Sequence, residues 1–330
     1  MKKVLCVGSA VMDILVQSDD LRVMKSHQVP GGVAIAEVYG GKTEAQNITL
    51  QTGGAGTNVA VGLSRLGLVS ASLARVGDDW MKDLVLDDLK REGVDISMVQ
   101  VGKGEKTGMS VVLVAADGGR SIITYRGAAK KMNSAEVDWN KVATADWVQI
   151  AALGGNLSLA EDLVSFATSK NIPVGWNPGK GELTQKERMI RILPKVELLI
   201  LNRMEASQLV HHPYEEMRQM AEKIANYGVK KVVITDGKRG AGVMVEGVWT
   251  SAAAFKIKSV DDTGAGDAFI AGMVAGILDG KDVHTSLKMG LANGASEVME
   301  LGAKAGLLRK NEMVKWSRRR LKIVEERSVN

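Results

Sequence analysis

The chain has 330 residues, of which 45% are apolar and 25% are charged, and its formal net charge is +5. This composition is typical of a folded, water-soluble protein and excludes a disordered, collagen-like or coiled-coil chain. The small net charge does not favour a nucleic-acid partner, and no run of about 20 apolar residues predicts a membrane span. Because Cys6 is the one cysteine and no signal-peptide pattern follows Met1, we expect no disulfide and a cytoplasmic location.

Short β-branched runs alternate with helix-like segments along most of the chain. Strands are expected at residues 3–7, 71–76, 147–151, 174–177, 198–201 and 231–235. Helices are expected at residues 57–66, 80–91, 158–170 and 214–227, the third of them capped by Ser158. After Val283 the pattern predicts helix to the end, with the basic cluster 318–322 on the last helix. The alternation predicts a mostly parallel sheet covered by helices on both faces.

Two stretches break this alternation. Residues 107–115 and 121–126 flank Asp117-Gly118-Gly119-Arg120, a turn sequence that predicts a β-hairpin. Residues 33–38 and 47–51 are also strand-like. Antiparallel strands in the first third of an otherwise parallel chain predict a small separate sheet.

The most informative motif is the run from Val260 to Phe269, which reads VDDTGAGDAF. A strand-like run over 255–260 precedes it, and a helix over about 265–278 follows it. The small residues 264–266 therefore fall at a helix N-terminus. Free backbone N–H groups and the helix dipole favour an anion at such a position.

An acid stands beside this predicted anion site. Asp267 falls in the first turn of the helix, next to Gly264, Ala265 and Gly266. A carboxylate there can accept a proton from a substrate hydroxyl while the N–H groups stabilise a transferred phosphoryl group. The structural alternative is an acid that only favours the start of a helix.

Two other nucleotide-binding patterns are missing. Gly41-Lys42-Thr43 resembles the end of a Walker loop, but Ala36 stands where the first glycine is required. No GxGxxG follows a predicted strand, so a nicotinamide-dependent oxidoreductase rests on the α/β pattern alone.

DDTGAGDAF resembles the C-terminal signature of the ribokinase-like (PfkB) family of sugar and nucleoside kinases. Four more segments resemble family motifs in the same order: VGSAVMD at 7–13, GGAGTNVAVGLSRLG at 53–67, NRME at 202–205 and TDGKRG at 235–240. The resemblance implies one domain over 1–330, a three-layer α/β/α sandwich with a mostly parallel sheet. It also implies a β-sheet lid, from about 14–52 and 107–127, that covers the acceptor and pairs two chains as a homodimer.

The resemblance assigns roles at the predicted anion site and around it. Asp267 would be the general base, and Gly264 to Gly266 would form the anion hole. Asp13, Gly54 and Asn58 would hold substrate hydroxyls. Asp13 as a turn residue and Asn58 as a locally bonded helix residue are the structural alternatives.

It also assigns the nucleotide site. Thr235, Gly237 and Gly240 would line the ATP phosphates and ribose, and Asn293 would lie near the adenine. The alternative for the TxGxxG segment is a plain loop between strands.

The resemblance assigns two ion sites as well. Asn202 and Glu205 would hold Mg²⁺ through water, although the same spacing is a reciprocal helix cap. Asp261 and Thr263 match positions that in many relatives bind a monovalent cation such as K⁺.

Some positions depart from the family pattern and leave the acceptor open. Ala55 stands where ribokinases proper usually have lysine, and residues 151–155 contain no acid. Arg126 either reaches an anionic group of the substrate or is a solvated edge residue. The sequence thus predicts an ATP-dependent transfer of the γ-phosphate to a hydroxymethyl group of a sugar or nucleoside. The alternative is a non-catalytic sugar- or nucleotide-binding regulatory member of the same fold.

Overall fold

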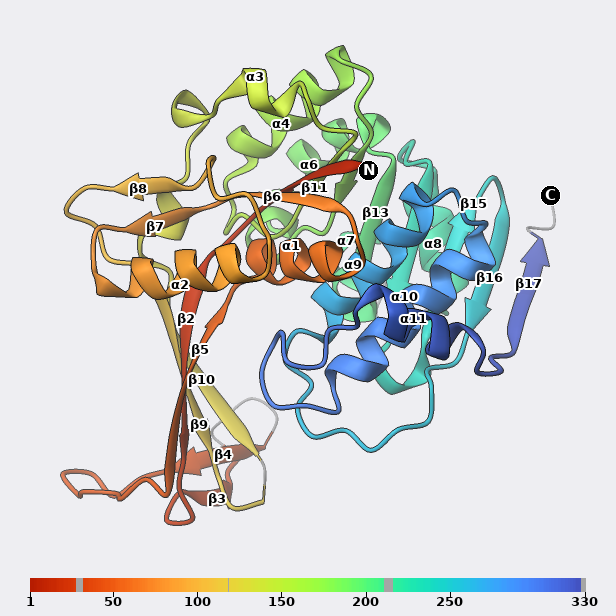
Figure 1. Cartoon of the computed structure of the whole chain (residues 1–330). Helices are drawn as coiled ribbons and strands as arrows, with labels where there is room; N and C mark the ends of the chain where they lie inside the picture. The colour runs from red at the N-terminus through yellow and green to blue at the C-terminus, as the bar shows by residue number, and fades with distance from the viewer. Residues whose placement is uncertain (28–31, 118, 211–215, 328–330) are drawn as a thin grey trace.

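The computed structural model describes residues 1–27, 32–117, 119–210 and 216–327, and its core is a nine-stranded sheet (Figure 1). In spatial order the strands are β17 (Ile323–Arg327), β16 (Val248–Ala252), β15 (Ala241–Val245), β14 (Lys231–Thr235), β13 (Leu198–Asn202), β12 (Val174–Trp176), β11 (Trp147–Ile150), β1 (Lys3–Val7) and β6 (Val69–Leu73). Pairing is parallel from β6 to β14 and antiparallel from β14 to β17. The predicted, mostly parallel sheet is confirmed.

Helices cover both faces of this sheet. One face carries α1 (Ala55–Arg65), α2 (Trp80–Arg91), α9 (Ala265–Leu278), α10 (Val283–Glu297) and α11 (Lys310–Ser317). The other carries α3 (Trp139–Val142), α4 (Leu157–Ser169), α5 (Lys180–Leu183), α6 (Lys186–Ile192), α7 (Arg203–Val210) and α8 (Met217–Ala225). Successive residues of β1 enter opposite cores, with Val4 and Cys6 on one side and Leu5 and Val7 on the other. Burial on both faces explains why such strands are continuous apolar runs.

A second sheet projects from the body as a long twisted arm (Figure 1). Its order is β10 (Arg120–Tyr125), β9 (Gly108–Val114), β2 (Val11–Gln17) and β5 (Asn47–Gly53). The hairpin β3 (Arg22–Lys25) and β4 (Val33–Ala36) lies at its far end, and β7 (Arg75–Gly77) pairs with β8 (Gln100–Gly102) in the body. The predicted small sheet is present, although residues 28–31 and Gly118 of the predicted lid lie outside the described residues.

The register of the arm separates two chemically different faces. Thr124, Ser110, Asp13 and Gln51 are cross-strand neighbours and form a polar row on one face. The next register position aligns Ile123, Val111, Ile14 and Leu50 as an apolar row on the opposite face. Alternation along each strand therefore puts the polar row on an inner face, which also carries Leu15, Val112 and Ile122, and the apolar row on an outer face.

Four local predictions are wrong: a strand, a helix cap, the length of the last helix and the place of the basic cluster. Residues 255–260 are not a strand, because the sheet edge is taken by β16, which ends at Ala252 and pairs with β17. The cap of α4 is Asn156, whose side chain accepts from the N–H of Leu159 at 3.2 Å, and not Ser158.

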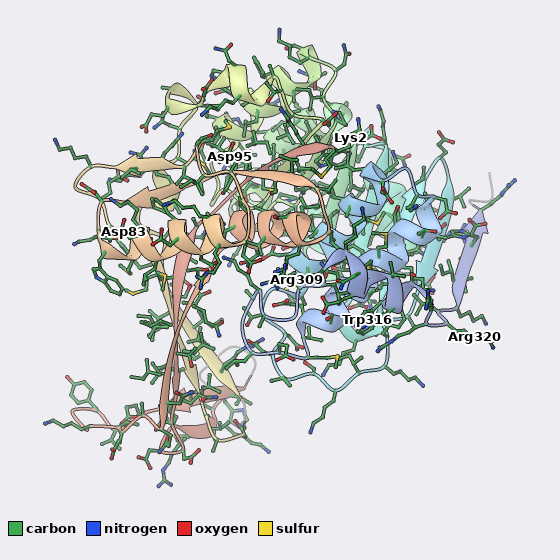
Figure 2. The ribbon with its side chains drawn as sticks, in the orientation of Figure 1. Lys2, Asp83, Asp95, Arg309, Trp316 and Arg320 are labelled. Atoms are coloured by element: carbon green, nitrogen blue, oxygen red, sulfur yellow. The ribbon has the colours of Figure 1, made fainter. Side chains whose placement is uncertain are left out.

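The helix predicted to continue to the end stops at Glu297, and residues 298–309 are irregular before α11. The basic cluster follows α11 instead of lying on it, with Arg320 beyond the helix and Arg319 stacked on Trp316 (Figure 2). The β-branched pair Ile323-Val324 joins β16 across the sheet edge, a long-range pairing that no local helical pattern reveals. None of the helices within the described ranges is long and apolar enough to cross a membrane.

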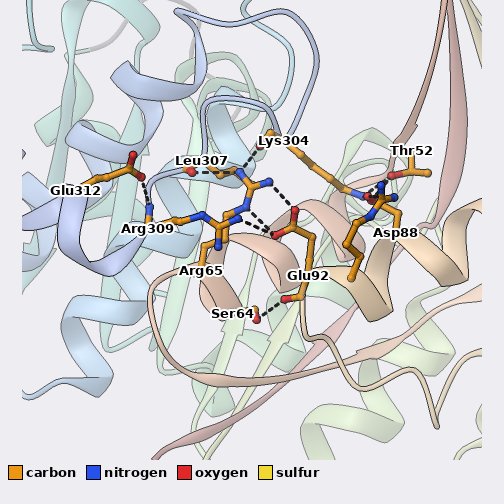
Figure 3. Close-up of polar contacts among 10 residues, drawn as sticks. Thr52, Ser64, Arg65, Asp88, Glu92, Lys304, Leu307, Arg309 and Glu312 are labelled. Atoms are coloured by element: carbon orange, nitrogen blue, oxygen red, sulfur yellow. Dashed lines mark hydrogen bonds and ion pairs between the residues drawn. The ribbon is translucent and has the colours of Figure 1, made fainter.

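Arg65 fastens the irregular segment to the rest of the body (Figure 3). Its guanidinium donates to both carboxylate oxygens of Glu92, at 2.8 and 2.9 Å. It also donates to the backbone carbonyls of Lys304 and Leu307, at 2.6 and 3.1 Å. One side chain on α1 thus holds the end of α2 and the loop before α11.

Arg65→Met should lower the free energy of unfolding by about 3 kcal/mol, because Glu92 keeps a largely buried charge whose nearest remaining cation is Arg309, at 3.8 Å. Chemical denaturation measures this change. The matched control is Lys90→Met, which breaks the exposed pair with Asp87 and should cost less than about 1 kcal/mol. Equal losses in the two variants would contradict the anchoring role of Arg65.

Candidate active site

The site is organised by the first turn of α9. Gly264 has φ 77°, a left-handed conformation, and a Cβ built there would lie 2.7 Å from Ala303 Cα. Only glycine meets both conditions, since a side chain would be strained and would collide with backbone. The carbonyl of Gly264 accepts the N–H of Ala268 at 2.8 Å, which starts the helix directly after this contact. The N–H groups of the first turn are thereby held in a fixed direction, and that of Ala265 makes a long hydrogen bond of 3.4 Å to the carbonyl of Asp262.

Two cavities meet at this helix start. A cavity of about 250 Å³, called the lid-side cavity, is lined among others by Asp13, Gly54, Asn58, Arg126, Gly264 and Asp267. A cavity of about 490 Å³, called the outer cavity, is lined among others by Thr235, Gly237, Gly240, Ala265, Gly266 and Phe269. Consecutive residues of one turn therefore line two different cavities, one on each side of the N-terminus of α9.

Asp267 is the buried acid at this junction. Burial raises the pKa of its carboxyl to about 6, against the opposing effects of Asn58 and Lys304. Asn58 Nδ2 donates to Asp267 Oδ2 at 2.8 Å. Asn58 Oδ1 is buried and has no hydrogen-bond partner among the described residues, so it remains available to accept a hydroxyl in the lid-side cavity.

The polar row of the arm brings a second acid to the lid-side cavity. The pKa of Asp13 is raised by burial, while its hydrogen bond with Ser110 and the charge of Lys304 act in the opposite direction. Gly54, with φ 101°, lies so close to the Ser9 carbonyl that no side chain fits. A bound molecule can therefore approach bare backbone beside Asp13.

The predicted nucleotide residues divide into two groups. Thr235, Gly237 and Gly240 line the outer cavity together, where β14 ends and the chain turns. Asn293 does not: its side chain is fully buried, donates to the carbonyl of Ala268 at 2.7 Å and accepts from the N–H of Leu308 at 2.9 Å. Both amide groups are used to join α10 to its neighbours, so Asn293 is a packing residue in this structure.

Asn202 and Glu205 form the reciprocal cap that the sequence left as an alternative. Glu205 Oε2 accepts the N–H of Asn202 at 2.9 Å, and Asn202 Oδ1 accepts the N–H of Glu205 at 2.8 Å. The register places Asn202 beside Thr235, close to the outer cavity. Because each side chain keeps a further polar atom, the pair fits a water-mediated contact to a metal–phosphate group.

The predicted monovalent-cation residues already have a cationic partner. Asp261 is buried and accepts the N–H and hydroxyl of Thr263, the N–H of Gly302 and the guanidinium of Arg120. Arg120 also donates to Thr263 Oγ1 at 3.1 Å. Since the guanidinium of the arm neutralises Asp261, these residues do not fit a free K⁺ in this conformation.

Sequence reasoning missed two charged residues that shape the site. Lys304 is largely buried, donates to Thr52 Oγ1 at 2.8 Å and pairs with Asp88 at 3.1 Å (Figure 3). Its charge opposes the raised pKa of both Asp13 and Asp267. No local signal marks Lys304, because its partners lie more than 200 residues away in sequence.

Glu297, the last residue of α10, is the second missed residue. It is fully buried, its carboxylate oxygens have no close hydrogen-bond partner among the described residues, and the charge of Arg65 and the N–H of Gly306 lower its pKa only in part. Desolvation raises its pKa to about 8, so the group is mostly a neutral acid at pH 7. Because Glu297 is neutral, it adds no second buried negative charge near Asp267.

The family of the chain follows from comparison with known proteins. Residues 1–310 match the profile of the pfkB family of carbohydrate kinases. The chain belongs to this family. The match spans both cavities and the arm, so the resemblance inferred from the five motifs is confirmed.

Similar proteins agree with this membership. A ribokinase of Bacillus subtilis is 26% identical over 315 residues, covering 95% of this chain and 98% of the relative. A 5-dehydro-2-deoxygluconokinase of Clostridium tetani is 31% identical over 269 residues, covering 76% of this chain and 79% of the relative.

Solved structures of the ribokinase fold superimpose on the chain. The Arabidopsis thaliana ribokinase complexed with ribose and ATP gives a TM-score of 0.82 at 24% identity, over 97% of this chain and 99% of that one. A nucleoside kinase of Methanocaldococcus jannaschii gives 0.78 at 22% identity, over 96% and 98%. These likenesses confirm the ribokinase-like α/β/α fold with its separate small sheet.

Proposed function

We propose that this pfkB-family member transfers the γ-phosphate of ATP to a hydroxymethyl group of a sugar or nucleoside. The observation that carries the proposal is the meeting of two cavities at the N-terminus of α9, with Asp267 buried at the junction. The acceptor would occupy the lid-side cavity and the nucleotide the outer cavity. In-line transfer requires the acceptor hydroxyl to approach the γ-phosphorus directly, opposite the leaving oxygen of ADP, so the two molecules must bind next to each other.

Asp267 is proposed as the general base. Its pKa of about 6 leaves it mostly ionised at pH 7, yet closer to the working pH than an exposed aspartate. Asn58 holds one carboxylate oxygen, which leaves the other to accept the proton of the acceptor hydroxyl. The first-turn N–H groups at Gly264–Gly266 stabilise negative charge on the transferred group.

The acceptor is held by groups suited to hydroxyls. Asp13 accepts hydroxyl protons, Asn58 Oδ1 offers a further buried acceptor, and Gly54 exposes backbone. Relatives named as ribokinase, deoxyribokinase, fructokinase and 5-dehydro-2-deoxygluconokinase support a sugar-like acceptor.

The donor site is proposed from the outer cavity and the relatives. Ribokinase-family structures similar to this chain have been solved with ATP, one of them also with Mg²⁺. When bound, Mg²⁺ would neutralise charge on the donor phosphates, and Asn202 and Glu205 would hold it through water. Within the described ranges no three acidic, histidine or cysteine side chains converge on a protein-only metal site, which agrees with a metal carried by the nucleotide.

The arm is proposed to pair with the arm of a second chain. On its outer face Ile48, Leu50 and Ile123 are 60, 51 and 63% exposed. Leu50 and Ile123 belong to the apolar row, and Ile48 lies beside Val16 in the next row of the same face. Covering this face with the same face of another copy would bury those side chains and shield the acceptor from water.

Asp267→Asn should lower kcat by about 10²–10⁴-fold, because an amide cannot accept the hydroxyl proton. In the unaltered enzyme kcat/KM should fall as the pH drops below about 6, since protonation of Asp267 removes the base. A coupled ADP-release assay over a panel of sugars and nucleosides measures both. Near-normal kcat in the variant would contradict the assignment, and ligand-induced stabilisation without any turnover would favour the non-catalytic alternative.

Leu50→Glu should shift the chain from dimer to monomer in light scattering, because a charge on the outer face cannot be buried against its copy. The control Val38→Glu changes an exposed side chain beyond β4 and should leave the mass unchanged. A monomeric unaltered protein, or a dimer that persists in Leu50→Glu, would contradict pairing through the arm.

A further inference from the structure

The lid-side cavity contains two cations without a protein partner. Arg126 and Lys130 both line it, and neither has an ion pair or side-chain hydrogen bond within the part of the chain that the structure describes. The neighbouring Lys131 differs, because its ammonium lies 3.8 Å from Glu105. Of the three cationic side chains in this turn, Arg126 and Lys130 therefore line the cavity without an acidic partner.

The turn that carries these cations is fixed by the backbone. Gly127, with φ 50°, packs directly on the carbonyl of Lys106, which also accepts the N–H of Ala128 at 2.8 Å. At the other end, Asn156 Nδ2 donates to the carbonyl of Met132 at 2.7 Å. Because both ends are anchored, Arg126 and Lys130 start from defined positions at the cavity wall.

Arg126 extends to the loop that follows β11. A Cβ built on Gly154 would lie 3.4 Å from Arg126 Nη1, so the guanidinium lies against glycine backbone. Residues 151–155 contain no side-chain acceptor. The nearby Glu182 is fully buried and accepts the N–H groups of Leu153, Gly155 and Gly179 at 2.8 to 2.9 Å, which fixes this loop.

Within the described residues, neither Asp13 nor Asp267 lies within ion-pair distance of Arg126 or Lys130. The charge that lowers the pKa of both Asp13 and Asp267 is that of Lys304, which reaches the site from the opposite loop. Arg126 and Lys130 contribute donors only, whereas the neutral hydroxyls of a sugar need acceptors as well. A planar guanidinium beside an ammonium matches a carboxylate or a phosphate, which accept several charge-assisted hydrogen bonds.

We propose that the acceptor is an anionic sugar, whose carboxylate or phosphate is held by Arg126 and Lys130 while its hydroxymethyl group faces Asp267. This inference rests on the proposed function, and it names the substrate class of that site. The nucleotide phosphates are accounted for separately, because neither cation lines the outer cavity. Arg126 is therefore a specificity-determining residue and not part of the transfer itself.

The test compares three acceptors: a neutral pentose, the same pentose with a phosphate on its anomeric carbon, and a keto-sugar acid. Binding is measured by calorimetry without nucleotide, and turnover is measured with ATP and Mg²⁺. The variants are Arg126→Gln and Lys130→Gln, with Lys131→Gln as the matched control that removes a charge from the same turn.

One of the two anionic acceptors should bind at least about 10-fold more tightly than the neutral pentose. Whether the sugar phosphate or the sugar acid binds more tightly shows whether the site recognises a phosphate or a carboxylate. Arg126→Gln should raise Kd and KM for it about 10- to 100-fold with little change in kcat, since one charged hydrogen-bonding group is lost. Lys130→Gln should act in the same direction, and Lys131→Gln should have no effect.

Equal or better binding of the neutral pentose would overturn the inference. So would an equal loss for neutral and anionic acceptors in Arg126→Gln, because that result indicates a role in transfer. The two proposals fail separately. Anion-selective binding that depends on Arg126, without any phosphoryl transfer, supports the inference and contradicts the proposed function. Phosphoryl transfer to neutral sugars that Arg126→Gln does not change supports the proposed function and contradicts the inference.

Discussion

The close contact between Gly264 and Ala303 is the constraint on which the site depends. A left-handed residue in direct contact with a neighbouring backbone lets α9 begin where two cavities meet. Without that contact the helix start would shift, and Asp267 would no longer lie against Asn58. The irregular segment 298–309 that supplies Ala303 is fastened to α1 by Arg65, so the largely buried Arg65–Glu92 ion pair also supports the start of α9.

Buried charge is balanced across the junction between the arm and the body. Lys304 opposes the raised pKa of Asp13 and Asp267 and is itself held by Thr52 and Asp88. From the inner face of the arm, Arg120 forms an ion pair with the buried Asp261 and donates to Thr263. Because the arm supplies several of these partners, its position and the electrostatics of the helix start are linked.

Local motifs predicted the parts of the site that lie close together in sequence. The small residues at 264–266 identified the helix start, and the glycines around Gly54 identified a place where backbone is bare. The packing contacts of Asn293 with Ala268 and Leu308 were not predictable, because its own segment does not reveal them. Lys304 and Glu297 had no local signal for the same reason, since the groups around them come from distant segments.

In the fold, too, features set by local sequence were predictable, and features set by long-range pairing were not. Alternating β-branched and helical periodicity was sufficient for the parallel sheet, since each strand and helix carries its own pattern. The edge strand β17 was not predictable, because it is mostly exposed and exists through pairing with β16. Which apolar face of the arm remains uncovered became clear only from the register of its strands.

The most direct test of the account is a crystal structure of the protein with ADP, Mg²⁺, a fluoroaluminate and an accepted sugar. The account predicts the fluoroaluminate at the first-turn N–H groups of α9, with the acceptor hydroxyl within hydrogen-bond distance of Asp267. A fluoroaluminate bound away from residues 264–266, or an acceptor hydroxyl held by another base, would contradict it.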